Sequence, residues 1–224
     1  MNHPLDRPAW SALTSHQSGL ARGDGRAWRF AVDVSPFGAG ADASPESLAA
    51  LDALLPGGGS LGLVEAVMPP PPAGVTLAQD SAVLQMLWPD HPGAGDAPLL
   101  ALGDDDAADM HALATLTRPG PFLASTHTMG RFLGIREGSR LAAMAGERLH
   151  CRGFTEISGV CTHPDFRGRG HAATLMRAVG ANILARGETP FLHVYPDNHT
   201  AIAMYERLGF RPRRELRYCV WTRG

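Results

Sequence analysis

Apolar positions change from a strand-like to a helical spacing between Thr155 and Arg186, the clearest pattern in the chain. Residues 156–162 mix β-branched and small side chains, which is typical of a strand partly buried on both faces. Pro164 and Asp165 end this strand. Beyond a glycine-rich turn, one stripe of apolar residues recurs at helical spacing: Ala172, Leu175, Met176, Val179, Ile183 and Leu184. The pattern predicts a strand, a turn and a helix in that order.

The patterns before this segment predict a short buried strand at residues 99–102 and a helix from Asp104 to about Leu116. Residues 131–136 and 140–148 then predict a β-hairpin, with a helix as the alternative for the second piece. The patterns after it predict a strand at 190–195, a helix at 201–208 capped by Asn198 and ended by Gly209, and a closing strand from Phe210.

The first 97 residues show weaker patterns. Residues 27–32 predict a strand, and residues 45–55 predict a short helix capped by Ser44. Residues 60–66 and 75–87 predict either one or two strands, or a strand and a helix. Glycine and proline runs separate these segments, and residues 91–95 form the best boundary. We therefore divide the chain into an N-terminal α/β region (1–97) and a second domain (98–224).

Composition and charge exclude several classes of protein. The chain is 44% hydrophobic and 19% charged, as in an ordinary soluble globular protein, and no apolar run is long enough to span a bilayer. Residues 1–97 hold four arginines and ten acidic residues, whereas residues 98–224 hold sixteen and twelve. This mildly basic half suits an anionic cofactor, not a nucleic acid. The N-terminus lacks the features of a signal peptide, so a cytoplasmic location is expected.

The glycine-rich turn predicts an anion site. The first N–H groups of a helix have no intrahelical partner and carry the positive end of its dipole. Gly168 and Gly170 allow the backbone to approach a phosphate closely, and Arg167 and Arg169 add positive charge. The turn is no Walker loop, because the chain contains no lysine, and Ala173 replaces the third glycine of a dinucleotide fingerprint.

The same turn resembles the pyrophosphate-binding signature [Q/R]-x-x-G-x-[G/A] of the GNAT superfamily of acyl-CoA N-acyltransferases. Arg167, Gly170 and Ala172 occupy its defined positions. A second string resembles the family's N-x-x-A-x-x-x-Y-x-x-x-G-F pattern and matches it at Asn198, Ala201, Tyr205, Gly209 and Phe210. The resemblance covers about residues 98–224 and implies an α/β (α+β) GNAT fold. That fold is a mixed, largely antiparallel sheet with splayed central strands between helices. Some members carry a degenerate second copy of the fold, and the N-terminal region is a candidate for such a copy.

The resemblance also implies roles for individual residues. Tyr205 matches the family's general acid, which protonates the leaving thiolate; its alternative role is packing. Glu156 stands where some members place a general base, and this role requires a pKa raised by partial burial. Its alternative is an exposed charge at a strand edge. The cofactor-binding residues are expected to be Val160, Cys161, Thr162, Arg167, Gly168, Arg169, Gly170, His171, Ala172, Asn198 and Ala201.

Two other kinds of chemistry are less well supported. Cys161 is better explained as a small core residue than as a nucleophile, because transfer in this family is direct. No pair of histidines has metal-binding spacing, so no metal is expected. His163 and His193 either line the acceptor pocket or are satisfied polar residues at strand ends.

Together these features predict a cytoplasmic N-acetyltransferase that moves an acetyl group from acetyl-CoA to a primary amine of a small molecule or peptide. An acyl-CoA sensor without turnover and an enzyme with another acyl donor or acceptor are the alternatives. The sequence predicts neither a nucleic-acid nor a membrane partner.

Overall fold

The computed structural model describes residues 3–90 and 99–223. Its helices are α1 (Pro8–Leu13), α2 (Pro45–Leu54), α3 (Ala107–Thr117), α4 (His171–Ala185) and α5 (His199–Leu208). Its strands are β1 (Ala21–Gly23), β2 (Ala27–Phe30), β3 (Gly38–Gly40), β4 (Ser60–Glu65), β5 (Thr76–Leu87), β6 (Leu100–Leu102), β7 (Phe132–Glu137), β8 (Arg140–Cys151), β9 (Phe154–Thr162), β10 (Thr189–Val194) and β11 (Arg211–Thr222). The predicted boundary at residues 91–95 lies outside the described residues.

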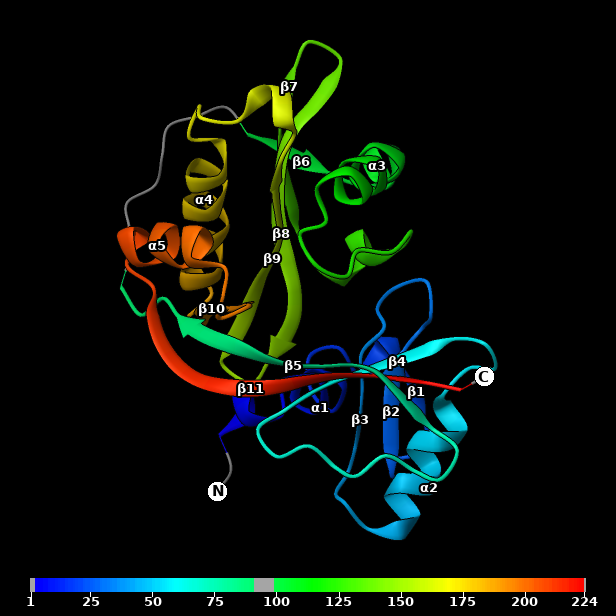
Figure 1. Ribbon diagram of the computed structural model, residues 1–224. Helices are drawn as coiled ribbons and strands as arrows, with labels where there is room; N and C mark the ends of the chain where they lie inside the picture. The colour runs from blue at the N-terminus through cyan, green and yellow to red at the C-terminus, as the bar shows by residue number, and fades with distance from the viewer. Residues whose placement is uncertain (1–2, 91–98, 224) are drawn as a thin grey trace.

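Eight of these strands form one sheet in the order β4-β11-β5-β10-β9-β8-β7-β6 (Figure 1). Neighbouring strands are antiparallel except β9 and β10, which are parallel. The predicted mixed, largely antiparallel sheet is therefore confirmed, and so is the hairpin of β7 and β8. Strands β1, β2 and β3 form a separate three-stranded sheet.

The N-terminal part of the chain contributes two strands to the large sheet. Residues 60–66 and 75–87 both form strands, β4 and β5, which settles the alternative that the sequence left open. β5 lies between β10 and β11 and pairs with both of them, and β4 pairs with the outer edge of β11. One end of the sheet is therefore built from segments far apart in sequence. That residues 1–97 are a degenerate copy of the fold stays a prediction.

The two central strands splay apart, as expected. β9 and β10 are paired only where residues 154–156 face residues 189–191. Beyond this point β10 continues as the partner of β5 up to Val194, whereas β9 runs on to Thr162 beside β8. The edge of β9 that faces β10 consequently carries backbone groups that the sheet does not pair.

Helices cover the two faces of the sheet around this split (Figure 1). The apolar stripe of α4 packs with α5 on one face, in a core that includes Met176, Val179 and Ile157. On the other face α3 packs Met110 and Leu113 against Phe132, Met144 and Cys161. Residues 99–102 were expected to form a buried strand. Residues 100–102 do form strand β6, but it lies at the edge of the sheet and Leu100 is 47% exposed, so the predicted burial is wrong.

Candidate active site

A cleft of about 800 Å³ opens where β9 and β10 separate. Residues 157–162 of β9 form one wall, and side chains of β10 and α5 form the other. A second hollow of about 630 Å³ lies at the start of α4. The two hollows share five lining residues: Thr162, Ala172, Thr200, Met204 and Arg207. The two hollows therefore form one continuous groove.

The start of α4 has the geometry of an anion site. Gly170 caps the helix with a φ of 79°, and Gly168 has a φ of 78°. A Cβ at either position would meet no atom within 4 Å. Both glycines therefore have a left-handed backbone conformation that favours glycine, and both leave open space beside the helix start. His171 and Ala172, whose N–H groups open the helix, both line this hollow.

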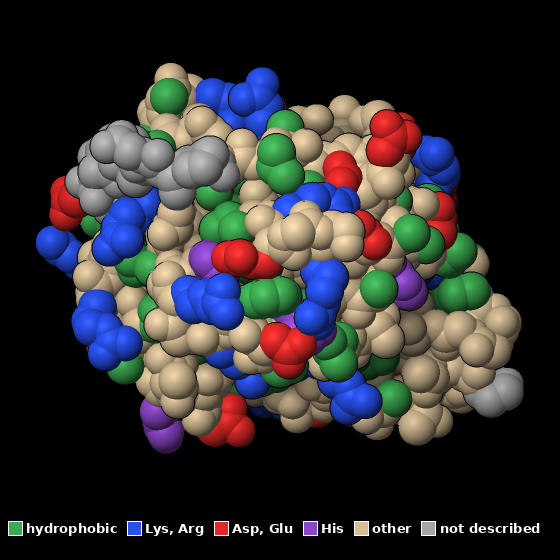
Figure 2. Space-filling model, turned by 90° about the horizontal axis from the view of Figure 1, so that it is seen from above, with side chains coloured by type: hydrophobic (Ala, Val, Ile, Leu, Met, Phe, Trp, Pro, Cys, Tyr) green, Lys and Arg blue, Asp and Glu red, His purple; other side chains and the backbone are tan. Residues whose placement is uncertain are grey.

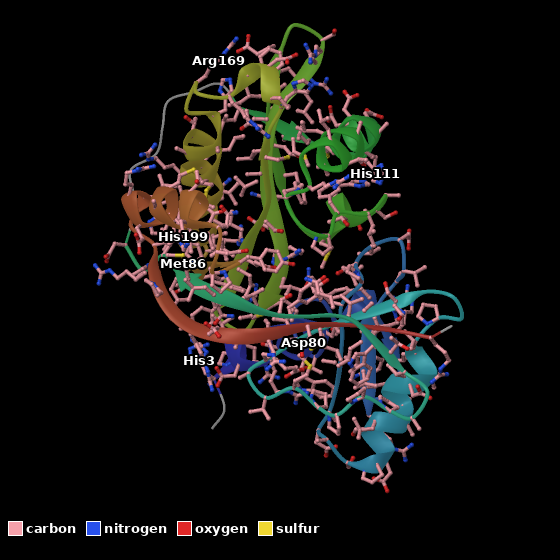
Figure 3. All side chains as sticks on the ribbon, viewed as in Figure 1. His3, Asp80, Met86, His111, Arg169 and His199 are labelled. Atoms are coloured by element: carbon pink, nitrogen blue, oxygen red, sulfur yellow. The ribbon has the colours of Figure 1, made fainter. Side chains whose placement is uncertain are left out.

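Four arginines line the hollow around this helix start. Arg167 and Arg169 were both predicted there, and Figure 3 shows Arg169 at this end of the molecule. Arg177 and Arg207, from α4 and α5, were missed because neither occupies a defined position of a motif. Figure 2 views this end and shows arginine side chains beside acidic ones. Arg169, for example, lies 3.5 Å from the carboxylate of Glu137.

A bulge interrupts β9 beside the cleft. Met144 faces Cys161, but Gly146 faces Ser158, so β9 contains one residue more than β8 over this stretch. Gly159 has a φ of 63°, and this left-handed backbone conformation accommodates the extra residue of the bulge. The backbone of Val160, Cys161 and Thr162 follows the bulge along the cleft. The side chain of Cys161 is buried, as a core residue should be, and burial raises the pKa of its thiol to about 11.

Helix α5 brings Tyr205 to the groove. The Asn198 side chain accepts a hydrogen bond of 3.1 Å from the Ala201 N–H, and Gly209 ends the helix with a φ of 101°. Both predicted caps are thus confirmed. Tyr205, Ala201 and Asn198 all line the cleft. Burial raises the pKa of the Tyr205 phenol above its usual value of 10, so the phenol is protonated at neutral pH.

Glu156 is fully buried at the floor of the cleft. Its carboxylate accepts hydrogen bonds from Arg148 Nε (2.8 Å) and Nη2 (2.7 Å) and lies 2.7 Å from His193 Nδ1. Burial alone would raise its pKa, but the charge and hydrogen bonds of Arg148, followed by those of His193, lower it to about 2. The raised pKa that a role as general base requires is therefore absent, and the alternative of an exposed charge at a strand edge is wrong.

Arg148 is a site residue that the sequence analysis missed. A second bulge explains its position: Glu147 faces Ile157, but His150 faces Thr155, so β8 contains an extra residue at 148–149. This bulge re-aims the side chain of Arg148 toward Glu156. A pattern of alternating residues cannot reveal such a bulge, so no local signal was available.

The two histidines singled out from the sequence differ in their surroundings. His193 lines the cleft, and its Nε2 lies 3.0 Å from the Gln85 amide nitrogen. His163 instead contacts Arg140 and Asp165 outside the cleft. Within residues 3–90 and 99–223, no group of three or more His, Cys, Asp and Glu side chains is placed to hold a metal ion. In the same ranges, no helix is long and apolar enough to cross a membrane.

Comparison with known proteins finds acetyltransferases among those that resemble this chain. The FR47-like protein family matches residues 132–221. A curated mycothiol acetyltransferase from Corynebacterium aurimucosum is 36% identical over 72 residues, 32% of this chain, and the chain matches only 23% of that protein's length. A GCN5-related N-acetyltransferase from Kribbella flavida has a TM-score of 0.62 at 21% identity, with 94% of this chain and 92% of that chain covered, and shows the fold.

A solved structure from Novosphingobium aromaticivorans resembles the chain over its whole length. That protein is described as an acetyltransferase of the GNAT family, and the two share 41% identity with a TM-score of 0.92. The alignment covers 100% of both chains, including the N-terminal region that the sequence motifs left unexplained. This chain therefore belongs to the GNAT family and is an acyltransferase.

Proposed function

We propose that the protein transfers an acetyl group from acetyl-CoA to the primary amine of a small molecule by direct attack. One observation carries this proposal: a single groove joins the helix start of α4, the unpaired edge of β9 and the phenol of Tyr205. The helix start and its arginines fit a pyrophosphate, and the edge of β9 fits an amide-containing arm that adds as a strand. An anion site at one end and an unpaired strand edge along one wall are the two features that support acyl-CoA as the ligand.

Each part of the groove then has a role in the reaction. A backbone N–H of the bulged segment of β9, at or next to Cys161, donates a hydrogen bond to the thioester carbonyl oxygen. The amine nitrogen attacks the carbonyl carbon, and the carbon–sulfur bond breaks. Tyr205 donates its phenolic proton to the leaving thiolate, because the raised pKa keeps that proton in place at neutral pH.

Removal of the amine proton is assigned to water in the groove. Glu156 is a poor base, because a carboxylate with a pKa of about 2 holds a proton only weakly. His193 is an equally poor candidate, because one ring nitrogen contacts Glu156 and the other contacts Gln85. We therefore propose that Glu156 and His193 hold the floor of the cleft in place and do not take up the amine proton. The open groove gives water access to the amine.

Calorimetric titration with acetyl-CoA tests the proposal, with free CoA and NADPH as controls. We expect micromolar binding of both CoA compounds and none of NADPH. An amine screen that detects the released thiol then tests turnover. Binding without turnover on any amine would favour the sensor alternative, and turnover only with a longer acyl-CoA would change the donor. Absence of CoA binding would overturn the proposal.

A further inference from the structure

The cleft continues beyond Tyr205 into a part that the cofactor roles above do not use. We call this part the acceptor end and define it by six lining residues: Phe37, Val64, Val83, Arg148, Glu156 and Tyr218. Four of them come from the N-terminal region or from β11. Figure 1 shows β4, β5 and β11 side by side below the start of α4. An amine at this end lies beside β9, because Glu156 of β9 is one of the six lining residues.

The acceptor end offers no free negative charge. Glu156 is the one carboxylate among the described residues that line the cleft. Its oxygens already accept two hydrogen bonds from Arg148 and contact His193. A substrate with several ammonium groups would leave its extra charges without a partner in a partly desolvated site, which is costly. This surface therefore disfavours polyamines and aminoglycosides.

Hydrogen-bond donors, in contrast, remain available. A guanidinium carries five N–H donors, and Arg148 uses only its Nε and Nη2 toward Glu156. Its Nη1 has no partner in the part of the chain that the structure describes, and 10% of its side chain is accessible. The hydroxyl of Tyr218 also has no hydrogen-bond partner within residues 3–90 and 99–223. Both groups suit a carboxylate.

These donors lie beside an apolar surface. The Arg148 guanidinium lies 5.0 Å above the ring of Phe37, and the ring of Tyr218 packs edge-on against the same ring at 6.0 Å. Val64 and Val83 line the cleft beside Phe37, and with exposures of 3–6% the three side chains present a narrow apolar wall. The acceptor end thus combines a wall for an aromatic or branched apolar group with two donors at its edge.

We infer that the acceptor is a small monoamine that carries a carboxylate and an apolar body, in other words an apolar or aromatic amino acid. This inference rests on the proposed acetyl transfer. The carboxylate binds Arg148 Nη1 and the Tyr218 hydroxyl, the apolar body packs on Phe37, and the amine is left to face the thioester. The N-terminal region then determines acceptor specificity, because it supplies Phe37, Val64 and Val83.

A matched pair of acceptors tests the inference with acetyl-CoA as donor. L-phenylalanine and 2-phenylethylamine differ only in the carboxylate, and spermidine represents the polyamines. We expect kcat/KM for phenylalanine to exceed that for phenylethylamine at least about tenfold, the ratio that a charge-assisted hydrogen bond supports. Spermidine should be the poorest of the three. Equal or better use of phenylethylamine or spermidine would overturn the inference and leave acetyl transfer intact.

Two variants locate the effect. Tyr218→Phe keeps the ring and removes the hydroxyl, so it should lower the phenylalanine-to-phenylethylamine ratio about threefold or more, through KM. Arg148→Lys should lower the ratio further. Arg186→Lys is the matched control, because Arg186 pairs with the buried Glu147 in the same way but does not line the cleft.

The outcomes separate the inference from the proposed function. An unchanged ratio in folded Tyr218→Phe and Arg148→Lys proteins that still bind acetyl-CoA would overturn the assignment of the carboxylate site. If Arg148→Lys fails to fold, Tyr218→Phe alone decides. Failure of the unaltered protein to acetylate any amine overturns the proposed function, and the inference with it.

Discussion

Arg148 and Glu156 form a bidentate ion pair at the floor of the cleft, with N–O distances of 2.8 and 2.7 Å. The two residues meet because β8 has an extra residue opposite Glu156. Both side chains are almost completely buried, so neither charge is screened by bulk water. The pair sets the charges at this site. Glu156 stays ionised because its pKa is lowered, and the Arg148 guanidinium keeps N–H donors that Glu156 does not use.

Glu156→Gln should destabilise the fold strongly. The change leaves the Arg148 charge buried without its counter-charge, and breaking one side of such a pair costs about 3–5 kcal/mol. Urea unfolding monitored by circular dichroism measures the loss. Glu137→Gln is the control, because Glu137 pairs with Arg169 at the surface and should cost no more than about 1 kcal/mol. Equal losses of unfolding free energy in the two variants would show that the buried pair stabilises the fold no more than the surface pair does.

The same pair predicts how stability changes with pH. The pKa of Glu156 falls from 4.5 to about 2 on folding, so the folded protein favours the ionised carboxylate. The contribution of Glu156 to stability is therefore complete above pH 4.5 and is lost as the pH falls from 4.5 toward 2. Unfolding free energies of the unaltered protein and of Glu156→Gln should converge over that range. A constant difference down to pH 2 would contradict the lowered pKa.

Sequence patterns predicted the parts of this site that depend on local backbone chemistry. The glycine-rich turn before α4 and the Asn198 cap of α5 each depend on residues that are close together in sequence, so the sequence predicted both. The acceptor end depends instead on pairing between distant segments. β5 inserts between β10 and β11, and Arg148 reaches Glu156 only through a bulge. A bulge changes strand register without changing composition, so periodicity could not reveal it.

Gly170→Glu should weaken acetyl-CoA binding at least tenfold. The new carboxylate would lie at a helix start that favours anions, and it would repel the pyrophosphate. Gly74→Glu is a matched control, because Gly74 has a φ of 77°, has open space around its Cβ position and does not line the groove. Both variants carry the same backbone strain, so a difference in calorimetric affinity reports the anion site. Equal affinities would remove the phosphate-binding assignment.

Tyr205→Phe should lower kcat by about a hundredfold and leave acetyl-CoA affinity unchanged. The variant keeps the ring that packs 5.7 Å from Phe210 but removes the proton that the thiolate needs. Stopped-time assays of thiol release at saturating acceptor measure kcat, and calorimetry measures affinity. A variant that retains full kcat would assign Tyr205 to packing, the alternative that the sequence left open.

The pKa of the acceptor amine should set the acid limb of the pH–rate profile, because no group of the protein is assigned as the base that deprotonates this amine. Only the neutral amine attacks, so kcat/KM should rise with pH until the amine's own pKa is reached. Two acceptors that keep the carboxylate but differ in amine basicity should therefore give limbs displaced by the difference between their pKa values. Tyr205 should add no alkaline limb below pH 10, because burial raises its pKa above that value. A limb at one fixed pH for both acceptors would instead reveal a titrating group on the protein, and His193 would be the first residue to substitute, since it lines the cleft and contacts Glu156.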